Sequence, residues 1–80
     1  MKRIIEKKKI TRELAIEFIS SQVNSENHPI SWHKLVIRID HEYKVRKNGW
    51  MLVRSALQEL VNANLIERVD SIFKEEYKLK

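Results

Sequence analysis

Three stretches of the sequence space their apolar residues three and four positions apart, and this pattern constrains the fold more than any other feature. They follow Thr11, Ser31 and Asn48. Apolar residues at that spacing share one face of an α-helix, and Thr, Ser and Asn are favoured residues just before a helix begins. The sequence therefore predicts three amphipathic helices. They cover residues 11–23, 32–42 and 50–63.

The apolar stripes of these helices predict the core. Ile37 falls off the stripe of the second helix, at its edge or exposed to solvent. The predicted core positions are Leu14, Ala15, Phe18, Ile19 and Val23, then Trp32, Leu35, Val36, Ile39 and Tyr43, then Leu52, Val53, Ala56, Leu57, Leu60 and Val61.

The C-terminal part of the chain predicts a β-hairpin. Asn62 and Asn64 mark the end of the third helix, since Asn tolerates the left-handed backbone found there. Two strands, over residues 65–69 and 72–79, are joined by Asp70-Ser71. Because two strands alone are marginally stable, a third strand around Ile30 is expected to pair with them. The fold class is α+β, mostly α.

Composition limits the alternatives. The chain has 80 residues, one glycine, one proline and no cysteine, so it predicts a single domain without disulfides or thiolate metal sites. No apolar run reaches the roughly 18 residues that a membrane helix needs, and residues 1–10 lack a signal-peptide core. We expect a cytoplasmic protein. Residues 1–10 form a basic N-terminal arm or an extension of the first helix, and residues 11–80 form the domain.

Basic residues gather in two separate blocks. Residues 1–12 have a net charge of +5 and residues 31–54 a net charge of +4, within a total of +5. Clustered cations attract polyanions. The alternative is a soluble basic surface that has no ligand.

Two segments carry a resemblance to a known family. Residues 53–68 read VRSALQELVNANLIER, and they look like the end of a recognition helix that runs into a first wing strand. Residues 30–35, ISWHKL, are similar to the start of the second helix in the same proteins. The order helix, short strand, helix, helix, hairpin also resembles the winged-helix variant of helix-turn-helix proteins. The resemblance implies a three-helix winged-helix domain with a C-terminal two-stranded β-hairpin wing.

That resemblance also implies a function, which is binding of double-stranded DNA by a transcriptional regulator. The third helix would enter the major groove, where Arg pairs with guanine and Gln with adenine. Many such domains act as homodimers on two half-sites. The predicted contacts are Met51, Arg54, Ser55 and Gln58 on the exposed helix face, Lys44, Arg46, Lys47 and Asn48 as a phosphate clamp, and Lys7, Lys8 and Lys9 in the arm. For the helix face, the alternative is an ordinary solvated surface.

Two features depart from the family pattern. Residues 40–49 make the region between the second and third helices long, so they are either more helix or an unusual basic loop. The hairpin tip, Asp70-Ser71, lacks the Arg or Lys of a DNA-contacting wing. These two features favour a second hypothesis, as do Trp50 and Ile37, which lies off the apolar stripe of its helix. In this hypothesis the protein is an interaction module that binds and modulates a partner protein such as a polymerase or nuclease. Trp50 itself is expected to cover the core, to stack on a sugar or to sit at a dimer contact.

Catalytic and metal chemistry have no pattern to support them. His28, His33 and His41 are spaced by five and eight residues, which matches neither a helical pair nor a zinc finger. The one glycine, Gly49, cannot form a glycine-rich phosphate loop. We therefore expect no enzyme activity, no metal and no cofactor.

Overall fold

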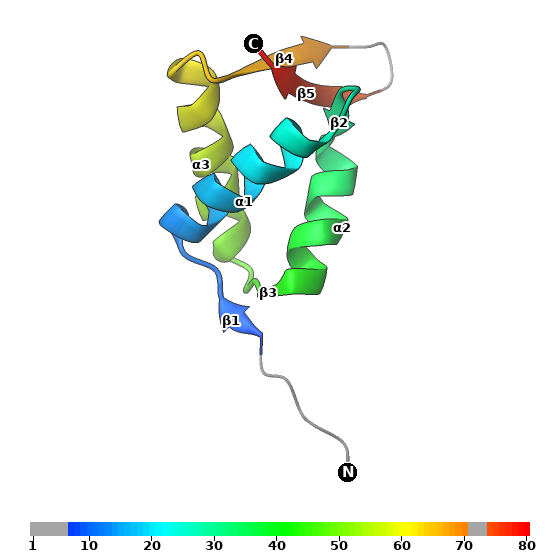
Figure 1. Ribbon diagram of the computed structural model, residues 1–80. Coiled ribbons are helices and arrows are strands. Elements are labelled where there is room, and N and C mark those ends of the chain that lie inside the picture. Colours follow the sequence, from blue (N-terminus) through cyan, green and yellow to red (C-terminus); the bar gives the residue numbers. More distant parts are fainter. Residues whose placement is uncertain (1–6, 71–73) are drawn as a thin grey trace.

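All three predicted helices form in the computed structural model, which describes residues 7–70 and 74–80. Within those ranges the protein is an α+β domain in which helix predominates, with three helices and a three-stranded antiparallel sheet (Figure 1). In chain order the elements are β1 (Lys8–Lys9), α1 (Arg12–Ser25), β2 (Ile30–Ser31), α2 (Trp32–Glu42), β3 (Tyr43–Lys44), α3 (Gly49–Asn62), β4 (Ile66–Asp70) and β5 (Glu75–Leu79).

Side chains cap the first two helices as the sequence predicts. Thr11 Oγ1 accepts a 3.2 Å hydrogen bond from the Leu14 N–H at the start of α1. Ser31 Oγ accepts one of the same length from the Lys34 N–H at the start of α2. Asn48 holds the corresponding position before α3, but its side chain makes no capping hydrogen bond. The first turn of α3 is thus not closed by a side chain.

Two residues after the end of α3 at Asn62 lies a left-handed Asn, as the sequence predicts. Asn64 has a φ of 62°. Its N–H donates to the Val61 carbonyl at 3.0 Å, and the Leu65 N–H donates to the Leu60 carbonyl at 3.1 Å. This pair of bonds is the Schellman motif, which satisfies carbonyls left over at the end of a helix. The chain turns there into β4, although Leu65 itself is exposed.

The third strand forms at Ile30, as expected, and the sheet has the order β2-β5-β4. Tyr77 on β5 lies in register with Ile30 on one side and with Arg68 on the other. The prediction of a two-residue loop at Asp70-Ser71 is wrong, because Asp70 pairs with Glu75. β4 therefore includes Asp70, and β5 begins at Glu75. The predicted positions at residues 71–73 lie outside the described residues.

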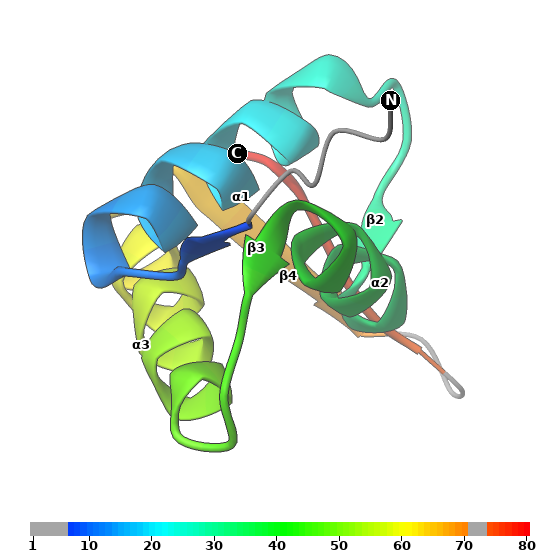
Figure 2. The same cartoon turned by 90° about the horizontal axis from the view of Figure 1, so that it is seen from below.

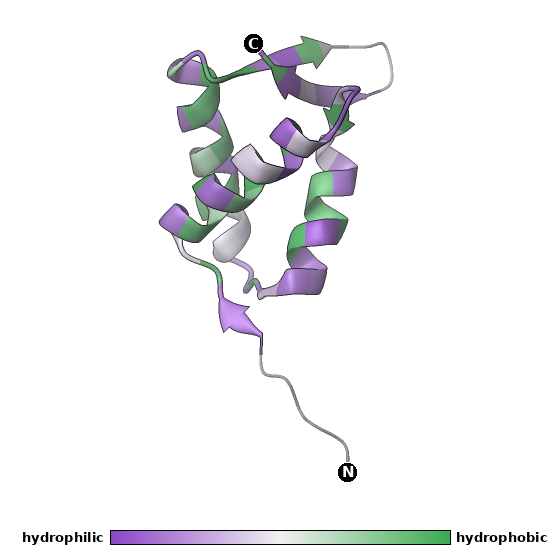
Figure 3. Ribbon diagram, viewed as in Figure 1, coloured by the Kyte–Doolittle hydropathy of each residue, from purple (hydrophilic) through white to green (hydrophobic). Residues whose placement is uncertain are grey.

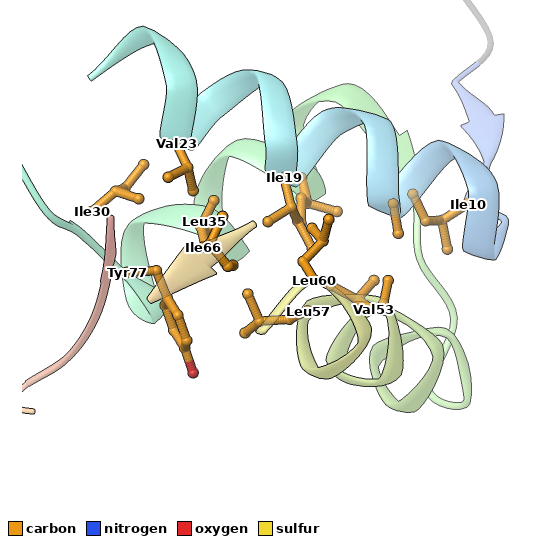
Figure 4. Close-up of a cluster of buried hydrophobic side chains, with 13 residues drawn as sticks. Ile10, Ile19, Val23, Ile30, Leu35, Val53, Leu57, Leu60, Ile66 and Tyr77 are labelled. Carbon is orange, nitrogen blue, oxygen red and sulfur yellow. The ribbon is translucent and has the colours of Figure 1, made fainter. Parts of the chain in front are cut away.

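The helices and the sheet enclose one apolar core (Figure 4). Some predicted core residues, such as Leu14, Phe18 and Trp32, are only partly buried and pack around its edge. Trp50 also packs against the core with partial exposure. The buried residues are Ile10, Ala15, Ile19, Val23, Ile30, Leu35, Ile39, Val53, Ala56, Leu57, Leu60, Ile66 and Tyr77.

A short parallel pairing between β1 and β3 is absent from the sequence prediction. Lys8 lies in register with Tyr43, and Lys9 with Lys44. The Ile10 N–H donates to the Lys44 carbonyl at 3.0 Å, and the Ile10 side chain is buried. Residues 7–10 are therefore an extended segment attached to β3, not a continuation of α1 (Figure 2). The long region of residues 40–49 is thus divided between several elements. Residues 40–42 end α2, residues 43–44 form β3, residues 45–48 form a loop, and α3 begins at Gly49.

Gly49 lies where two side chains approach the start of α3 closely. An added Cβ would lie 2.9 Å from Val45 Cγ1 and 3.2 Å from Ile10 Cγ2. Both distances are shorter than ordinary contacts between carbon atoms. The single glycine thus lets the start of α3 approach the loop after β3 and the segment after β1.

Candidate nucleic-acid interface

The exposed face of α3 carries the predicted base-contacting residues. Val53, Ala56 and Leu57 are buried, so the opposite side of the helix faces outward. Met51 is 74% exposed, and the Arg54 side chain is 48% exposed. Ser55 and Gln58 are also exposed. The four side chains are therefore exposed on one helix face, as the sequence predicts.

This face borders a groove of about 330 Å³ between α3 and the sheet. The groove is open and has both polar and apolar walls. Its lining residues are Met51, Arg54, Ser55, Leu57 and Gln58 from α3, and Arg68, Glu75 and Tyr77 from β4 and β5. The sheet thus supplies charged groups to the surface that the third helix exposes.

Arg54 is held in place by two other elements. Its Nη1 donates to both carboxylate oxygens of Glu75, at 3.0 Å each. Its Cζ lies 4.4 Å from the centroid of the Trp32 ring, which is cation–π distance. The side chain therefore connects α3 to β5 and to the first residue of α2.

Glu75 is the centre of a small polar network. Its side chain is 19% exposed, and its carboxylate accepts a 2.6 Å hydrogen bond from the Tyr77 hydroxyl group. Arg68 Nη1 lies 3.5 Å from Glu75 Oε1. Burial raises the pKa of Glu75, but the hydrogen bonds from Tyr77 and Arg54 outweigh burial, and the net pKa is lowered from its ordinary 4.5. The network thus holds a carboxylate anion.

Sequence reasoning missed Glu75, although a signal was present. Residues 75 and 77 share one face of a strand under its two-residue alternation. Because Tyr77 is an apolar ring on that face, Glu75 belongs there too. A carboxylate on a partly buried face requires a cationic or hydrogen-bonding partner. Arg54 is that partner.

The two basic blocks of the sequence meet in one place. Pairing of β1 with β3 puts Lys8 and Lys9 beside Tyr43 and Lys44. Arg46 and Lys47 follow in the loop that leads into α3, and these cations are exposed. We call Lys8, Lys9, Lys44, Arg46 and Lys47 the basic cluster. It lies at the N-terminal end of α3, at the opposite end of the molecule from the three-stranded sheet (Figure 1).

Lys7 and Asn48 differ from the other predicted contacts. Lys7 Nζ donates a 2.8 Å hydrogen bond to the backbone carbonyl of Asp40, in the last turn of α2. A cation is favourable at the end of α2 because a helix C-terminus carries partial negative charge. Figure 3 shows that β1 and the end of α2 are hydrophilic. Lys7 therefore helps to attach β1, and Asn48 lies exposed at the start of α3.

Glu59, an acidic residue close to the exposed face of α3, has its charge balanced. Arg12 donates to Glu59 Oε2 through Nε at 3.1 Å and through Nη2 at 2.8 Å. Arg12 is thus paired with α3 and is separate from the basic cluster. Gln58 is likewise engaged, since its Nε2 donates to Asn62 Oδ1 at 2.9 Å along the helix.

In the part of the chain that the structure describes, no His, Asp and Glu side chains form a group of three or more that could hold a metal ion. Nor does any helix in the described ranges have the length and apolar character needed to cross a bilayer. No protein-family model matches the chain, and no curated protein or solved structure matches it.

Proposed function

We propose that the protein is a winged-helix domain that binds double-stranded DNA as a transcriptional regulator. In this proposal α3 enters the major groove, which is wide enough for a helix, and the β4–β5 hairpin is the wing. The arrangement α1-β2-α2-α3-β4-β5, with sheet order β2-β5-β4, supports the assignment. The exposed polar face of α3 supports the choice of the reading helix.

The observation that carries the proposal is the basic cluster. Five exposed cations come from two distant parts of the sequence, and the pairing of β1 with β3 places those two parts side by side near the start of α3. In the proposed complex they hold the phosphates on either side of the groove that α3 occupies. Phosphate contacts fix the position of a protein on DNA, and contacts to bases select the sequence. One small module buries only about 600–1,000 Å² on DNA, so we propose that two copies bind two half-sites.

Titration with salt tests this function. Binding of a fluorescent random-sequence duplex is measured by anisotropy at several salt concentrations. The triple variant Lys44→Gln, Arg46→Gln, Lys47→Gln should bind more weakly and reduce the salt slope by about 0.9 for each phosphate that it no longer neutralises. The control is Lys34→Gln, Arg38→Gln, Lys80→Gln, which removes the same charge from α2 and from the residue after β5, outside the basic cluster, α3 and the hairpin. Equal effects of the two triple variants would contradict a localized phosphate clamp.

A second candidate function is binding to a partner protein through α2. Ile37 is 55% exposed on this helix and lines two grooves, of about 330 and about 480 Å³. Phe18 adds apolar surface to the smaller groove. A partner such as a polymerase or nuclease that buries this apolar surface should bind with weak salt dependence. Ile37→Gln would weaken that binding strongly and, because it adds no charge, leave the affinity for duplex DNA unchanged.

A further inference from the structure

The most specific polar arrangement in the described structure surrounds Arg54. Its Nη1 is fully engaged by Glu75, and one face of the guanidinium group lies on Trp32. Among the described residues, neither Nε nor Nη2 of Arg54 makes a hydrogen bond. These two nitrogens form one edge of the planar group, and their N–H bonds point the same way.

The partners of Arg54 are themselves restrained. Glu75 is fixed by the Tyr77 hydroxyl group and by Arg68, and Tyr77 is buried between β2 and β4. Trp32 begins α2 and packs against the core. Holding a long side chain in one rotamer costs conformational entropy. The contacts of Arg54 with Glu75 and Trp32 restrict its side chain before any ligand arrives.

From this geometry we infer that Glu75 and Trp32 are positioning residues, which hold Arg54 so that its Nε–Nη2 edge reads a guanine. The inference rests on the proposed DNA-binding function. Two parallel N–H donors match guanine N7 and O6, both of which are acceptors. Adenine presents an amino donor in place of O6, and Arg has no acceptor for it. The edge therefore selects guanine over adenine.

The same geometry disfavours phosphate as the ligand of this edge. A phosphate bound at Nε and Nη2 would lie close to the Glu75 carboxylate, and two anions repel each other at short range. A guanine edge is neutral and avoids that penalty. The five cations of the basic cluster, by contrast, make no ion pair with a carboxylate of the described residues. The molecule thus separates a base-reading arginine beside the sheet from phosphate-binding cations at the start of α3.

A base analogue tests the inference at the level of single atoms. A duplex is selected from a random-sequence library with the wild-type protein, and each guanine is then replaced by 7-deazaguanine, which lacks the N7 acceptor. At one position the replacement should weaken binding about tenfold, within the roughly 5- to 150-fold that a good bidentate contact contributes. Arg54→Ala should bind the normal and the substituted duplexes equally.

Variants of the positioning residues complete the test. Glu75→Gln should lose most of the discrimination against 7-deazaguanine, yet bind random duplex slightly more tightly because one negative charge is removed. Trp32→Phe keeps an aromatic face and should retain discrimination, whereas Trp32→Leu should reduce it. The matched control is Glu67→Gln on β4, whose exposed carboxylate lies 4.0 Å from Lys78. It changes the charge equally and should retain discrimination.

The outcomes separate the inference from the proposed function. Absence of salt-dependent duplex binding would overturn both. Salt-dependent binding without any sensitive guanine would overturn the inference alone. Full discrimination in Glu75→Gln would show that Arg54 does not need Glu75. Greater discrimination in that variant would mean that Glu75 competes with guanine. Circular dichroism at the binding temperature identifies any variant that has unfolded, and the two Trp32 variants then decide the result.

Discussion

The Tyr77 hydroxyl group donates a 2.6 Å hydrogen bond to Glu75 Oε1, two residues earlier on the same strand. The Tyr77 ring lies in the apolar core, and its hydroxyl oxygen points away from the other buried side chains (Figure 4). One residue thus connects the apolar interior to the carboxylate that positions Arg54. Both titratable groups are perturbed by this contact, which makes the connection measurable.

Tyr77 should titrate well above the usual range of a tyrosine. Burial, followed by the hydrogen bond to Glu75, raises its pKa from 10.0 to about 12. The folded state then holds the proton more tightly than the unfolded state. This contribution to stability is present below pH 10 and is lost as the pH rises toward 12. In a Tyr43→Phe variant, where Tyr77 is the remaining tyrosine, tyrosinate absorbance should report this pKa. A midpoint near 10 in the folded protein would contradict the buried hydrogen bond.

Glu75 should make the protein less stable in acid. Its pKa is lowered in the folded state, so its contribution to stability is present above its ordinary pKa of 4.5 and is lost as the pH falls below that value. Glu75→Gln should destabilise the protein at neutral pH by about 1–3 kcal/mol, since it weakens hydrogen bonds to a charged group. Urea unfolding at a series of pH values measures this. The difference from wild type should shrink in acid, and a difference independent of pH would contradict an ionic role.

Local patterns predicted the three helices and the side-chain caps of α1 and α2, because these depend on near neighbours, whereas the Asn48 side chain makes no capping hydrogen bond. Thr11 and Ser31 show this, and so does Asn64. Contacts between distant segments left no such pattern. Nothing periodic in Lys8–Lys9 or Tyr43–Lys44 indicates that they pair, since two residues are too few to show alternation. The exposed face of α3 was therefore predictable from its stripe. The sequence alone could not predict that the two basic blocks lie side by side or that Arg54 contacts Glu75. Both depend on how distant segments pack in the folded protein.

The left-handed backbone at Asn64 gives a test of the α3 terminus. Asn64→Ala should destabilise the protein by about 1–2 kcal/mol, because residues with a Cβ and no local polar group are strained at positive φ. Asn64→Gly should be tolerated, because glycine adopts this conformation without strain. Asn64 Oδ1 also accepts a 2.9 Å hydrogen bond from Lys80 Nζ. Lys80→Ala removes this hydrogen bond alone, so comparing its thermal unfolding with that of Asn64→Ala separates the hydrogen bond from the backbone strain. Equal stability of the Ala and Gly variants would show that backbone strain is unimportant here.

Gly49 tests whether close packing or helix propensity dominates at the start of α3. Alanine favours helix over glycine by about 1 kcal/mol, but the new Cβ would meet Val45 Cγ1 at 2.9 Å. Overpacking of this kind costs about 1–3 kcal/mol, so Gly49→Ala should lower the free energy of unfolding by about 1 kcal/mol. In a Val45→Ala background the clash partner is gone, and the same substitution should then be neutral or stabilising. A double-mutant cycle by urea unfolding measures the coupling. If Gly49→Ala has the same effect in both backgrounds, the segment after β1 and the loop after β3 do not pack closely against α3.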